Sequence, residues 1–286
     1  MPITFEKLSH EYHPDTPFAY LALDGIDLSI AEGKMTAIIG STGSGKSTLV
    51  QHLNALLLPS GGSVTVLDRT ITAGDKPKQL KELRKRVGLV FQFPEYQLFE
   101  ETVAQDIAFG PKNFGMSEEE ALAKAREMLA FVGLEESHLE RSPFELSGGQ
   151  KRRVAIAGIL AMDPDVLVLD EPAAGLDPQG AKEMMSLFVK LNREYHKTVL
   201  IVTHDMEHVL RYCDDVVVVD HGHIVQTADT ATFFRDTELL HQLRINPPAV
   251  IRLREALCAN GFVLSDQLLE MEELAAAVAQ AVEHHE

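Results

Sequence analysis

Gly40-Ser41-Thr42-Gly43-Ser44-Gly45-Lys46-Ser47-Thr48 is the stretch from which the fold of this chain is inferred. It has the spacing of a phosphate-binding loop, in which glycines let successive backbone N–H groups turn inward around a polyphosphate. In such a loop Lys46 reaches the β- and γ-phosphates of a nucleotide, and the hydroxyl of Ser47 binds Mg²⁺. An apolar segment, residues 35–39, precedes the loop, and apolar residues recur at helical spacing over residues 49–57. We therefore predict a strand, a nucleotide-binding loop and a helix here.

Length, composition and charge limit the class of protein. With 286 residues, the chain is long enough for one main α/β domain and an appendage. The apolar share of 45% and the charged share of 24% are typical of a folded globular protein. The 43 acidic and 26 basic residues give a net charge of −17, which would repel a nucleic-acid backbone. We therefore expect no nucleic-acid partner.

The cysteines and the N-terminal residues indicate a location in the cytoplasm. Cys213 and Cys258 lie far apart and lack the spacing of a metal site, as expected of unpaired thiols in a reducing compartment. The N-terminal residues lack the basic and apolar segments of a leader, and no apolar run approaches the roughly 20 residues of a membrane helix. We expect a cytoplasmic chain, which leaves room for attachment to a membrane partner.

The order of the apolar segments predicts an α/β fold. Residues 3–30 contain short runs that alternate between apolar and polar, as antiparallel strands covered on one face do. Helical periodicity dominates from about residue 101 to residue 162. Continuous apolar runs then follow at residues 166–169, 198–202 and 216–219, as in a parallel sheet buried on both faces.

Two segments follow from this order. We assign residues 1–245 to a nucleotide-binding domain, whose helical subdomain spans about residues 93–162. Residues 246–286 form a C-terminal helical extension, which opens at a Pro-Pro pair and holds two expected helices. The apolar stripe of the second helix suits internal packing or a partner surface.

An apolar run followed by two carboxylates supplies the second half of a nucleotide site. Asp170 and Glu171 follow residues 166–169, at the strand end where α/β sheets bind ligands. Asp170 would hold Mg²⁺, and Glu171 would polarise a water for in-line attack on the γ-phosphate. A surface turn is the alternative interpretation of such a pair, and the phosphate-binding loop argues against it.

A third motif, residues 146–150 with the sequence Leu-Ser-Gly-Gly-Gln, begins a predicted helix. Its serine and glycines offer a hydroxyl and N–H groups to an anion, although an ordinary helix cap has the same residues. This motif, Gln92, Asp170-Glu171, Ala174-Gly175-Leu176-Asp177 and His204 occur in the order seen in ATP-binding cassette ATPases. From residue 1 to about residue 243 the sequence resembles that family. The resemblance implies a P-loop fold with a mixed parallel core sheet, an antiparallel β subdomain and a helical subdomain.

The resemblance also implies which residues bind MgATP. Tyr12 matches the aromatic residue that stacks on adenine. The phosphate-binding residues would be Gly40, Ser41, Thr42, Gly43, Ser44, Gly45, Lys46, Ser47 and Thr48. The residues that contact ATP held by the opposite subunit would be Ser147, Gly148, Gly149 and Gln150. The Mg²⁺ ligands would be Ser47, Gln92 and Asp170.

Catalytic and communicating positions are implied in the same way. Glu171 matches the catalytic glutamate, with Lys46 and Gln92 acting beside it. His204 matches the histidine that senses the γ-phosphate, although a lone histidine at a strand end often has a purely structural role. Asp177 matches the aspartate that communicates across the dimer. Position 173 is alanine where many members of the family have threonine, which we do not expect to abolish hydrolysis.

A narrower resemblance lies in Phe91-Gln92-Phe93-Pro94-Glu95-Tyr96-Gln97-Leu98-Phe99-Glu100-Glu101-Thr102-Val103 and in residues 107–113. These segments resemble the ATPase subunits of energy-coupling factor transporters, most closely the second of their two ATPase subunits. The resemblance implies that the transmembrane T component docks near Gln97, Glu95 and Glu100. Acidic residues around Tyr96, Leu98 and Phe99 suit an arginine-tipped helix. The alternative is a solvated acidic helix over a local core.

The implied function is ATP hydrolysis that powers the import of vitamins or related micronutrients. The implied partners are a second, related ATPase subunit, the T component and the substrate-binding membrane S subunits, with the chain at the cytoplasmic face of the membrane. The C-terminal extension resembles the one through which these ATPases meet. One alternative is an importer ATPase with a conventional permease. Another is a soluble cassette ATPase acting on nucleic acid or ribosomes, which the charge of −17 disfavours.

Overall fold

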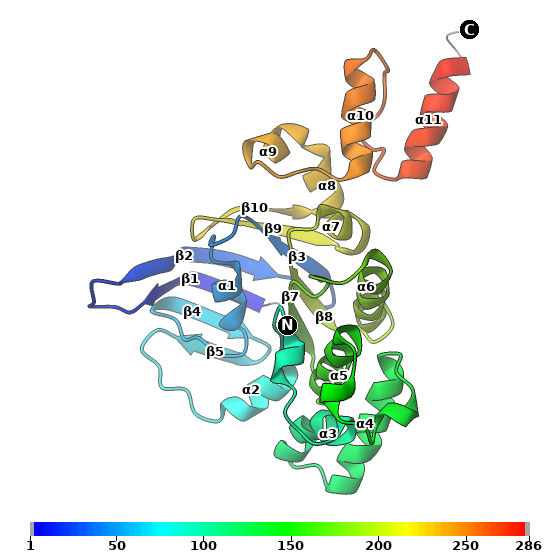
Figure 1. Cartoon of the computed structure of the whole chain (residues 1–286). Coiled ribbons are helices and arrows are strands. Elements are labelled where there is room, and N and C mark those ends of the chain that lie inside the picture. The colour runs from blue at the N-terminus through cyan, green and yellow to red at the C-terminus, as the bar shows by residue number, and fades with distance from the viewer. Residues whose placement is uncertain (1–2, 284–286) are drawn as a thin grey trace.

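The computed structural model describes residues 3–283 and arranges them in two β-sheets with helices around them (Figure 1). The four-stranded sheet consists of β2 (Tyr20–Ile30), β1 (Ile3–Tyr12), β4 (Gly61–Val66) and β5 (Arg69–Thr72), in that order. The six-stranded sheet consists of β10 (His223–Asp229), β9 (Asp215–Asp220), β3 (Met35–Ile39), β8 (Thr198–Val202), β7 (Val166–Asp170) and β6 (Val87–Val90). Residues 1–2 and 284–286, at the ends of the two predicted segments, lie outside the described range.

The six-stranded sheet is the core of the fold. From β9 to β6 neighbouring strands are parallel, and β10 joins the edge antiparallel to β9. Its side chains alternate between two hydrophobic clusters. In β3, Ala37 and Ile39 lie in one cluster and Ile38 in the other, and β7 and β8 alternate in the same way. Because both faces are buried along β7, β8 and β9, these strands are nearly continuous apolar runs, and the three predicted core strands are confirmed.

Strand register brings three chain segments together at one edge of this sheet. Ile38 near the end of β3 pairs with Val202 at the end of β8, and Val202 pairs with Asp170 at the end of β7. The segments that follow these three strands contain the phosphate-binding loop, Glu171 and His204. Motifs that are far apart in sequence therefore meet at the carboxyl edge, as the parallel topology requires.

The antiparallel sheet covers the other side of the phosphate-binding helix. β1 pairs with both β2 and β4 in antiparallel fashion, and β4 pairs with β5. Its inward side chains share a hydrophobic cluster with α1 (Lys46–Gln51), which contributes Leu49 and Val50. α2 (Leu80–Arg86) follows this sheet and has Arg84, Lys85 and Arg86 in its last turn.

A group of helices occupies the middle of the chain, at the lower right of Figure 1. Its α-helices are α3 (Val103–Asn113), α4 (Glu118–Phe131) and α5 (Gly148–Leu160). Its 3-10 helices are η1 (Pro94–Gln97), η2 (Glu136–His138) and η3 (Pro143–Glu145). A capping box begins α4, since Ser117 and Glu120 exchange side-chain and backbone hydrogen bonds there.

The remaining helices lead to the C-terminal end. They are α6 (Pro178–Arg193), α7 (Met206–Tyr212), α8 (Thr230–Arg235), α9 (Thr237–Gln242), α10 (Ala249–Ala259) and α11 (Met271–Glu283). Figure 1 shows α10 and α11 side by side, projecting beyond the six-stranded sheet. Within residues 3–283, each helix is too short or too polar to cross a membrane.

One helix is shorter than its sequence pattern predicts. The apolar spacing after the phosphate-binding loop extends to residue 57, but α1 ends at Gln51. Turns follow, in which Ala55 has a φ of 54° and Leu56 is 49% exposed. Leu53 and Ala55 in these turns are buried in the hydrophobic cluster of the antiparallel sheet. Periodicity alone does not distinguish such buried turns from a helix.

Candidate nucleotide-binding site

The phosphate-binding loop lies between the end of β3 and the start of α1, as predicted. Two of its glycines have positive φ angles and no room for a side chain. At Gly40 φ is 146°, and a Cβ atom would lie 2.0 Å from the carbonyl oxygen of Val219 on β9. At Gly45 φ is 108°, and a Cβ atom would lie 2.8 Å from the carbonyl oxygen of Ala22 on β2. The loop is therefore fixed between both sheets, while residues 41–43 stay exposed.

The side chain of Lys46 closes the loop. Its Nζ donates hydrogen bonds to the carbonyl oxygens of Gly40 at 2.9 Å and Ser41 at 2.7 Å. Burial lowers the pKa of this ammonium group, and the negative charges of Glu171 and Asp170 partly oppose that effect. An ammonium group held by carbonyl oxygens can exchange them for phosphate oxygens, which are stronger acceptors.

Ser47 and Asp170 form a pair of oxygen ligands. The hydroxyl of Ser47, at the start of α1, donates a hydrogen bond to Oδ2 of Asp170, at the end of β7, with a length of 2.9 Å. Burial raises the pKa of Asp170, while this hydrogen bond and Lys46 oppose the rise. Hydroxyl and carboxylate oxygens are ligands that Mg²⁺ prefers, so the pair fits that ion. Gln92 has an exposed side chain, and in the described chain it bonds to neither residue.

Glu171 and His204 form a second pair. Nδ1 of His204 donates a hydrogen bond of 2.7 Å to Oε1 of Glu171, so the free Nε2 can face a ligand. His204 is 78% exposed, whereas the Glu171 side chain is only 17% exposed. Glu171 also has a φ of 49°, in the left-handed region that residues other than glycine rarely adopt. Its backbone N–H donates to the carbonyl oxygen of Val202, which holds that conformation.

Tyr12 lies beside the phosphate-binding helix. Its hydroxyl oxygen lies 3.2 Å from Oγ1 of Thr48, and its ring packs edge-on against His10 with ring centres 4.6 Å apart. A second aromatic residue, which the sequence analysis did not single out, lies close to the loop. Tyr20 is 55% exposed, and its hydroxyl donates to the carbonyl oxygen of Gly43 at 3.5 Å.

The Leu-Ser-Gly-Gly-Gln motif of residues 146–150, the signature motif, lies at the start of α5. Ser147 caps α5: its hydroxyl accepts from the backbone N–H of Gln150, and its own backbone N–H donates to Oε1 of Gln150. Ser147, Gly148 and Gly149 are all exposed. Within residues 3–283, no side-chain hydrogen bond or ion pair joins these three to residues 40–48. The chain therefore does not bring its own signature to its own phosphate-binding loop.

Asp177 is also exposed, and it caps α6. Its Oδ1 accepts a hydrogen bond of 2.7 Å from the backbone N–H of Gly180. The cap fixes the first turn of this helix directly after the segment that follows Glu171. The side chain is therefore held in place at the surface.

One residue with structural importance was missed by the sequence analysis. Arg152, on α5, is only 3% exposed and bonds to the backbone of Gln92 and to the carboxylate of Glu95. In sequence it sits in the basic triplet 151–153, which resembles a solvated helix face. The only feature of the sequence that could have indicated its burial is its position on the face of α5 that packs against the core.

The pairing with Arg152 changes the description of the predicted docking segment. Glu95 was expected in an exposed acidic rim, but its carboxylate faces Arg152 and is 17% exposed. Leu98, expected as a surface anchor, is buried. The exposed residues are aromatic: Tyr96 is 85% exposed and Phe99 57% exposed. Glu100 and Glu101 are the acidic residues of this segment that remain available for a rim.

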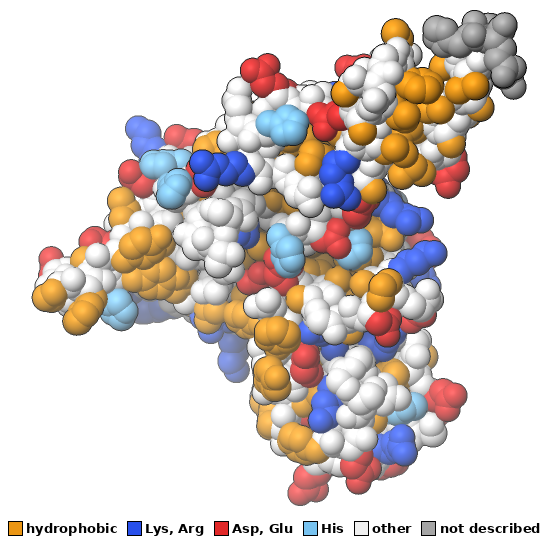
Figure 2. All heavy atoms as spheres, turned by 45° about the horizontal axis from the view of Figure 1, so that its top comes forward, with side chains coloured by type: hydrophobic (Ala, Val, Ile, Leu, Met, Phe, Trp, Pro, Cys, Tyr) orange, Lys and Arg blue, Asp and Glu red, His pale blue; other side chains and the backbone are white. Residues whose placement is uncertain are grey.

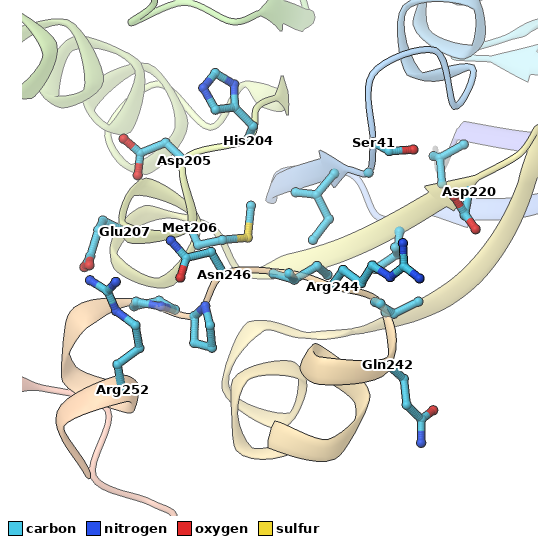
Figure 3. A pocket seen from close by; sticks show the side chains of 18 of the residues that line it. Ser41, His204, Asp205, Met206, Glu207, Asp220, Gln242, Arg244, Asn246 and Arg252 are labelled. Atoms are coloured by element: carbon cyan, nitrogen blue, oxygen red, sulfur yellow. The ribbon is translucent and has the colours of Figure 1, made fainter. Parts of the chain in front are cut away.

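A cavity of about 790 Å³ adjoins the nucleotide loop. Figure 3 shows Ser41 and Asp220 on one side of it and His204 and Glu207 on the other, with Arg244 between them. Its outer wall comes from residues 242–248, the segment that leads into α10. The C-terminal extension therefore begins next to the phosphate-binding edge of the sheet.

The fold and the grouping of these motifs are those of an ATP-binding cassette ATPase, and the ABC transporter family model matches residues 23–174. The "Energy-coupling factor transporter ATP-binding protein EcfA2" of Lactiplantibacillus plantarum is 55% identical over 280 residues, which cover 98% of this chain and 95% of that protein. The protein of the same name from Enterococcus faecalis is 53% identical over 275 residues, covering 96% and 95%. The chain belongs to this EcfA2 family of energy-coupling factor transporter ATP-binding proteins.

Solved structures agree with this assignment. CbiO1 from Clostridium perfringens, part of the ABC transporter complex cbiONQ, is 37% identical with a TM-score of 0.73 and covers 88% of this chain and 98% of its own. The ATP-binding cassette MJ0796, as a dimer in a post-hydrolysis state bound to ADP and Pi, is 30% identical with a TM-score of 0.72. That match covers 80% of this chain and 98% of the MJ0796 chain.

Proposed function

We propose that this chain binds MgATP together with a second cassette and hydrolyses it to power an energy-coupling factor importer of vitamins or related micronutrients. The observation that carries the proposal is the meeting of two residue pairs, Ser47–Asp170 and Glu171–His204, at one edge of the sheet. The second, related cassette would supply its own signature motif to this edge. Membership of the EcfA2 family supports the transporter assignment.

The proposed binding roles follow from the geometry. The phosphates lie against the backbone N–H groups of residues 40–48, and Lys46 transfers its hydrogen bonds from loop carbonyls to phosphate oxygens. Tyr12, beside Thr48, offers its ring to the adenine. Ser47, Asp170 and Gln92 would hold Mg²⁺, which would supply positive charge beside the phosphates.

Hydrolysis follows from the second pair. Glu171 accepts a hydrogen bond from the attacking water, whose oxygen forms a bond to the γ-phosphorus while the bond to the β–γ bridging oxygen breaks. His204 orients the Glu171 carboxylate through Nδ1 and can donate from Nε2 to the γ-phosphate when protonated there. The buried side of Glu171 limits competing contacts with bulk water.

The exposed motifs indicate a site shared by two chains. Ser147, Gly148 and Gly149, with Gln150 behind them, would complete the partner's site, and Asp177 would lie at the shared boundary. The bound anion would meet the N-terminus of α5 at the exposed residues Gly148 and Gly149, whose backbone N–H groups could donate to it. Closure on ATP and opening after hydrolysis would then move the two chains as rigid bodies.

The membrane partner would dock on η1 and α3. Phe93, Tyr96, Phe99 and Phe109 form an exposed aromatic surface, in which Phe99 and Phe109 pack edge-to-face with ring centres 4.8 Å apart. Exposed aromatic clusters are typical anchors of protein interfaces. With Gln97 and Glu100 nearby, this surface suits a basic coupling helix of the T component, which in turn would carry the S subunits. The chain would thus sit peripherally at the cytoplasmic face.

The C-terminal extension, residues 246–286, would add a second contact between the two cassettes, beyond a nucleotide-binding domain of residues 1–245 with its helical part at about 93–162. Figure 2 shows hydrophobic side chains gathered on this extension at the upper right. Val263 is 96% exposed, and Leu253, Met271 and Val282 are also exposed. Single exposed apolar residues are common on protein surfaces, whereas a group of them on one segment is typical of an interaction surface.

The Glu171→Gln variant tests the proposed function. In the purified transporter complex we expect ATP to bind with near-normal affinity while turnover falls by a factor of about 100 or more, because glutamine cannot accept the water proton. Steady-state phosphate release and binding of a fluorescent ATP analogue would measure the two quantities. Turnover at the wild-type rate would refute the role of Glu171. Isolation of the chain with a conventional permease and no T component would refute the transporter assignment.

A further inference from the structure

Arg152 is the most completely bonded buried cation described in this structure. It lies on α5, five residues after Ser147, and is 3% exposed. A buried guanidinium group is stable only when its charge is paired and its N–H groups are bonded. The partners of Arg152 therefore show what the residue holds in place.

All five N–H groups of Arg152 have acceptors. Nε donates to Oε2 of Glu95 at 3.2 Å, and Nη2 donates to Oε1 of Glu95 at 3.3 Å and to the carbonyl oxygen of Gln92 at 3.2 Å. Nη1 donates to the carbonyl oxygens of Pro172 at 3.3 Å and of Ala174 at 2.6 Å. The planar fork of arginine can make these bonds at once, whereas the ammonium group of lysine cannot.

These acceptors belong to two segments with different proposed roles. Gln92 and Glu95 frame the start of the aromatic surface, and the Phe93 ring lies under the guanidinium group at 5.9 Å. Pro172 and Ala174 directly follow Glu171, whose backbone is in the strained left-handed conformation. Arg152 itself lies on the helix that begins with the signature motif. One side chain thus joins the docking segment, the signature helix and the segment after the catalytic glutamate.

We propose that Arg152 is a positioning residue that couples the docking segment at residues 92–99 to the signature helix and to Glu171. A displacement of the docking segment by a membrane partner moves Gln92 and Glu95, and the rigid guanidinium transmits it to α5 and to residues 172–174. Among the described residues no hydrogen bond or ion pair joins Arg152 to residues 40–48, so we expect ATP affinity not to depend on it. The inference rests on the proposed roles of Gln92 and Glu171.

The Arg152→Lys variant, in the purified transporter complex, tests this link. Lysine keeps the charge opposite Glu95 but cannot reach both Gln92 and Ala174. We expect kcat for ATP hydrolysis to fall by about ten-fold or more, while the Kd of the fluorescent analogue MANT-ATP stays within about two-fold. A change in kcat without a change in Kd is not expected of a residue that only stabilises the fold.

Arg153→Lys is the matched control. Arg153 is the next residue on the same helix, and it bonds to the carbonyl oxygen of Val132 and to Glu183 instead. These partners lie outside the docking segment and the segment after Glu171, so kcat should stay within about two-fold of wild type. Equal losses in the two variants would overturn the proposal.

Glu95→Gln guards against a general loss of folding. It keeps the size of the side chain and removes the charge that faces Arg152. We expect kcat to fall at a Tm close to that of the wild type, and the double variant with Arg152→Lys to be no slower than Arg152→Lys alone, since both remove one link. If Arg152→Lys lowers Tm, Kd and kcat together, the Glu95→Gln result decides: wild-type kcat overturns the proposal, and a selective loss supports it.

The Glu171→Gln and Arg152→Lys variants together distinguish the coupling role of Arg152 from the proposed function. If Glu171→Gln keeps turnover, the proposed function is wrong. If Glu171→Gln stops turnover and Arg152→Lys retains wild-type kcat, only the coupling role of Arg152 is overturned.

Discussion

His52 lies directly behind the phosphate-binding loop and is fully buried. Its Nδ1 donates a hydrogen bond of 2.8 Å to the carbonyl oxygen of Thr48, and Nε2 is buried without a partner among the described residues. Burial lowers the pKa of the His52 side chain from 6.5 to about 4. The neutral form of this histidine is therefore part of the folded state.

Acid should consequently weaken the fold through His52. Below pH 6.5 the unfolded chain binds the proton and the folded chain does not, so unfolding becomes easier until about pH 4, where both forms are protonated. The difference corresponds to about 3 kcal/mol of unfolding free energy. The His52→Asn variant keeps a donor to Thr48 but does not titrate. Urea unfolding between pH 7 and pH 4 should show a steeper loss for wild type than for the variant, and parallel curves would contradict this.

Whether a functional residue can be placed from the sequence depends on whether its neighbours in space belong to recognisable motifs. The loop, Asp170-Glu171 and His204 lie at one edge of the sheet because each follows a parallel strand, an arrangement that the order of apolar runs predicts. Arg152 and the orientation of Glu95 were missed, since their partners are distant in sequence and a basic triplet on a helix usually faces solvent. Tertiary contacts alone determine which of three adjacent basic residues is buried.

Among the elements, the strands were more predictable than the helix boundaries. Burial on both faces made the core strands continuous apolar runs. The end of α1 was not predictable, because turns after Gln51 bury apolar residues at nearly helical spacing. The spacing of apolar residues indicates which residues are buried, but it does not indicate whether the backbone between them stays helical.

The junction between α7 and α10 supports a prediction at the same scale. The N-cap of α10 is Pro248, which makes no side-chain cap bond. Glu207 on α7 replaces it, since Oε1 accepts a hydrogen bond of 2.6 Å from the backbone N–H of Ala249. Glu207→Ala should therefore loosen α10 by about 1 kcal/mol, as the loss of other helix caps does.

Hydrogen exchange of the peptides that cover residues 249–259 would measure this effect. Exchange in α10 should be faster in Glu207→Ala, while exchange in the core strand β8 stays unchanged. Glu238→Ala is a suitable control, because Glu238 lies in the first turn of the neighbouring helix α9 without bonding to α10. Unchanged exchange in α10 would show that another group holds its first turn.

At the level of the whole molecule, the order of motifs determines the fold class and the family. Assembly with partner chains depends instead on exposed surfaces. Tyr96 is 85% exposed, and its ring is tilted against that of Phe93 with ring centres 6.0 Å apart. If the proposed T component docks on this surface, Tyr96→Ala should weaken that association by about 2 kcal/mol, as the loss of an aromatic interface anchor does. Its Tm should stay the same, because the side chain stabilises little within the chain.

Quantitative pull-down of the membrane component with purified chain would measure that association. Phe18→Ala is the matched control, since Phe18 is 81% exposed but lies in the loop between β1 and β2. Equal loss of association in the two variants would show that general surface hydrophobicity, rather than the surface on η1 and α3, determines binding.

The exposed signature at Ser147 has a consequence for reaction order. If each site needs a loop from one chain and a signature from another, hydrolysis at concentrations below the dimer Kd is second order, and it scales with the product of the two chain concentrations. Ten-fold dilution of both chains would then lower the rate about a hundred-fold rather than ten-fold. A chain produced without its partner would bind ATP and hydrolyse almost none of it.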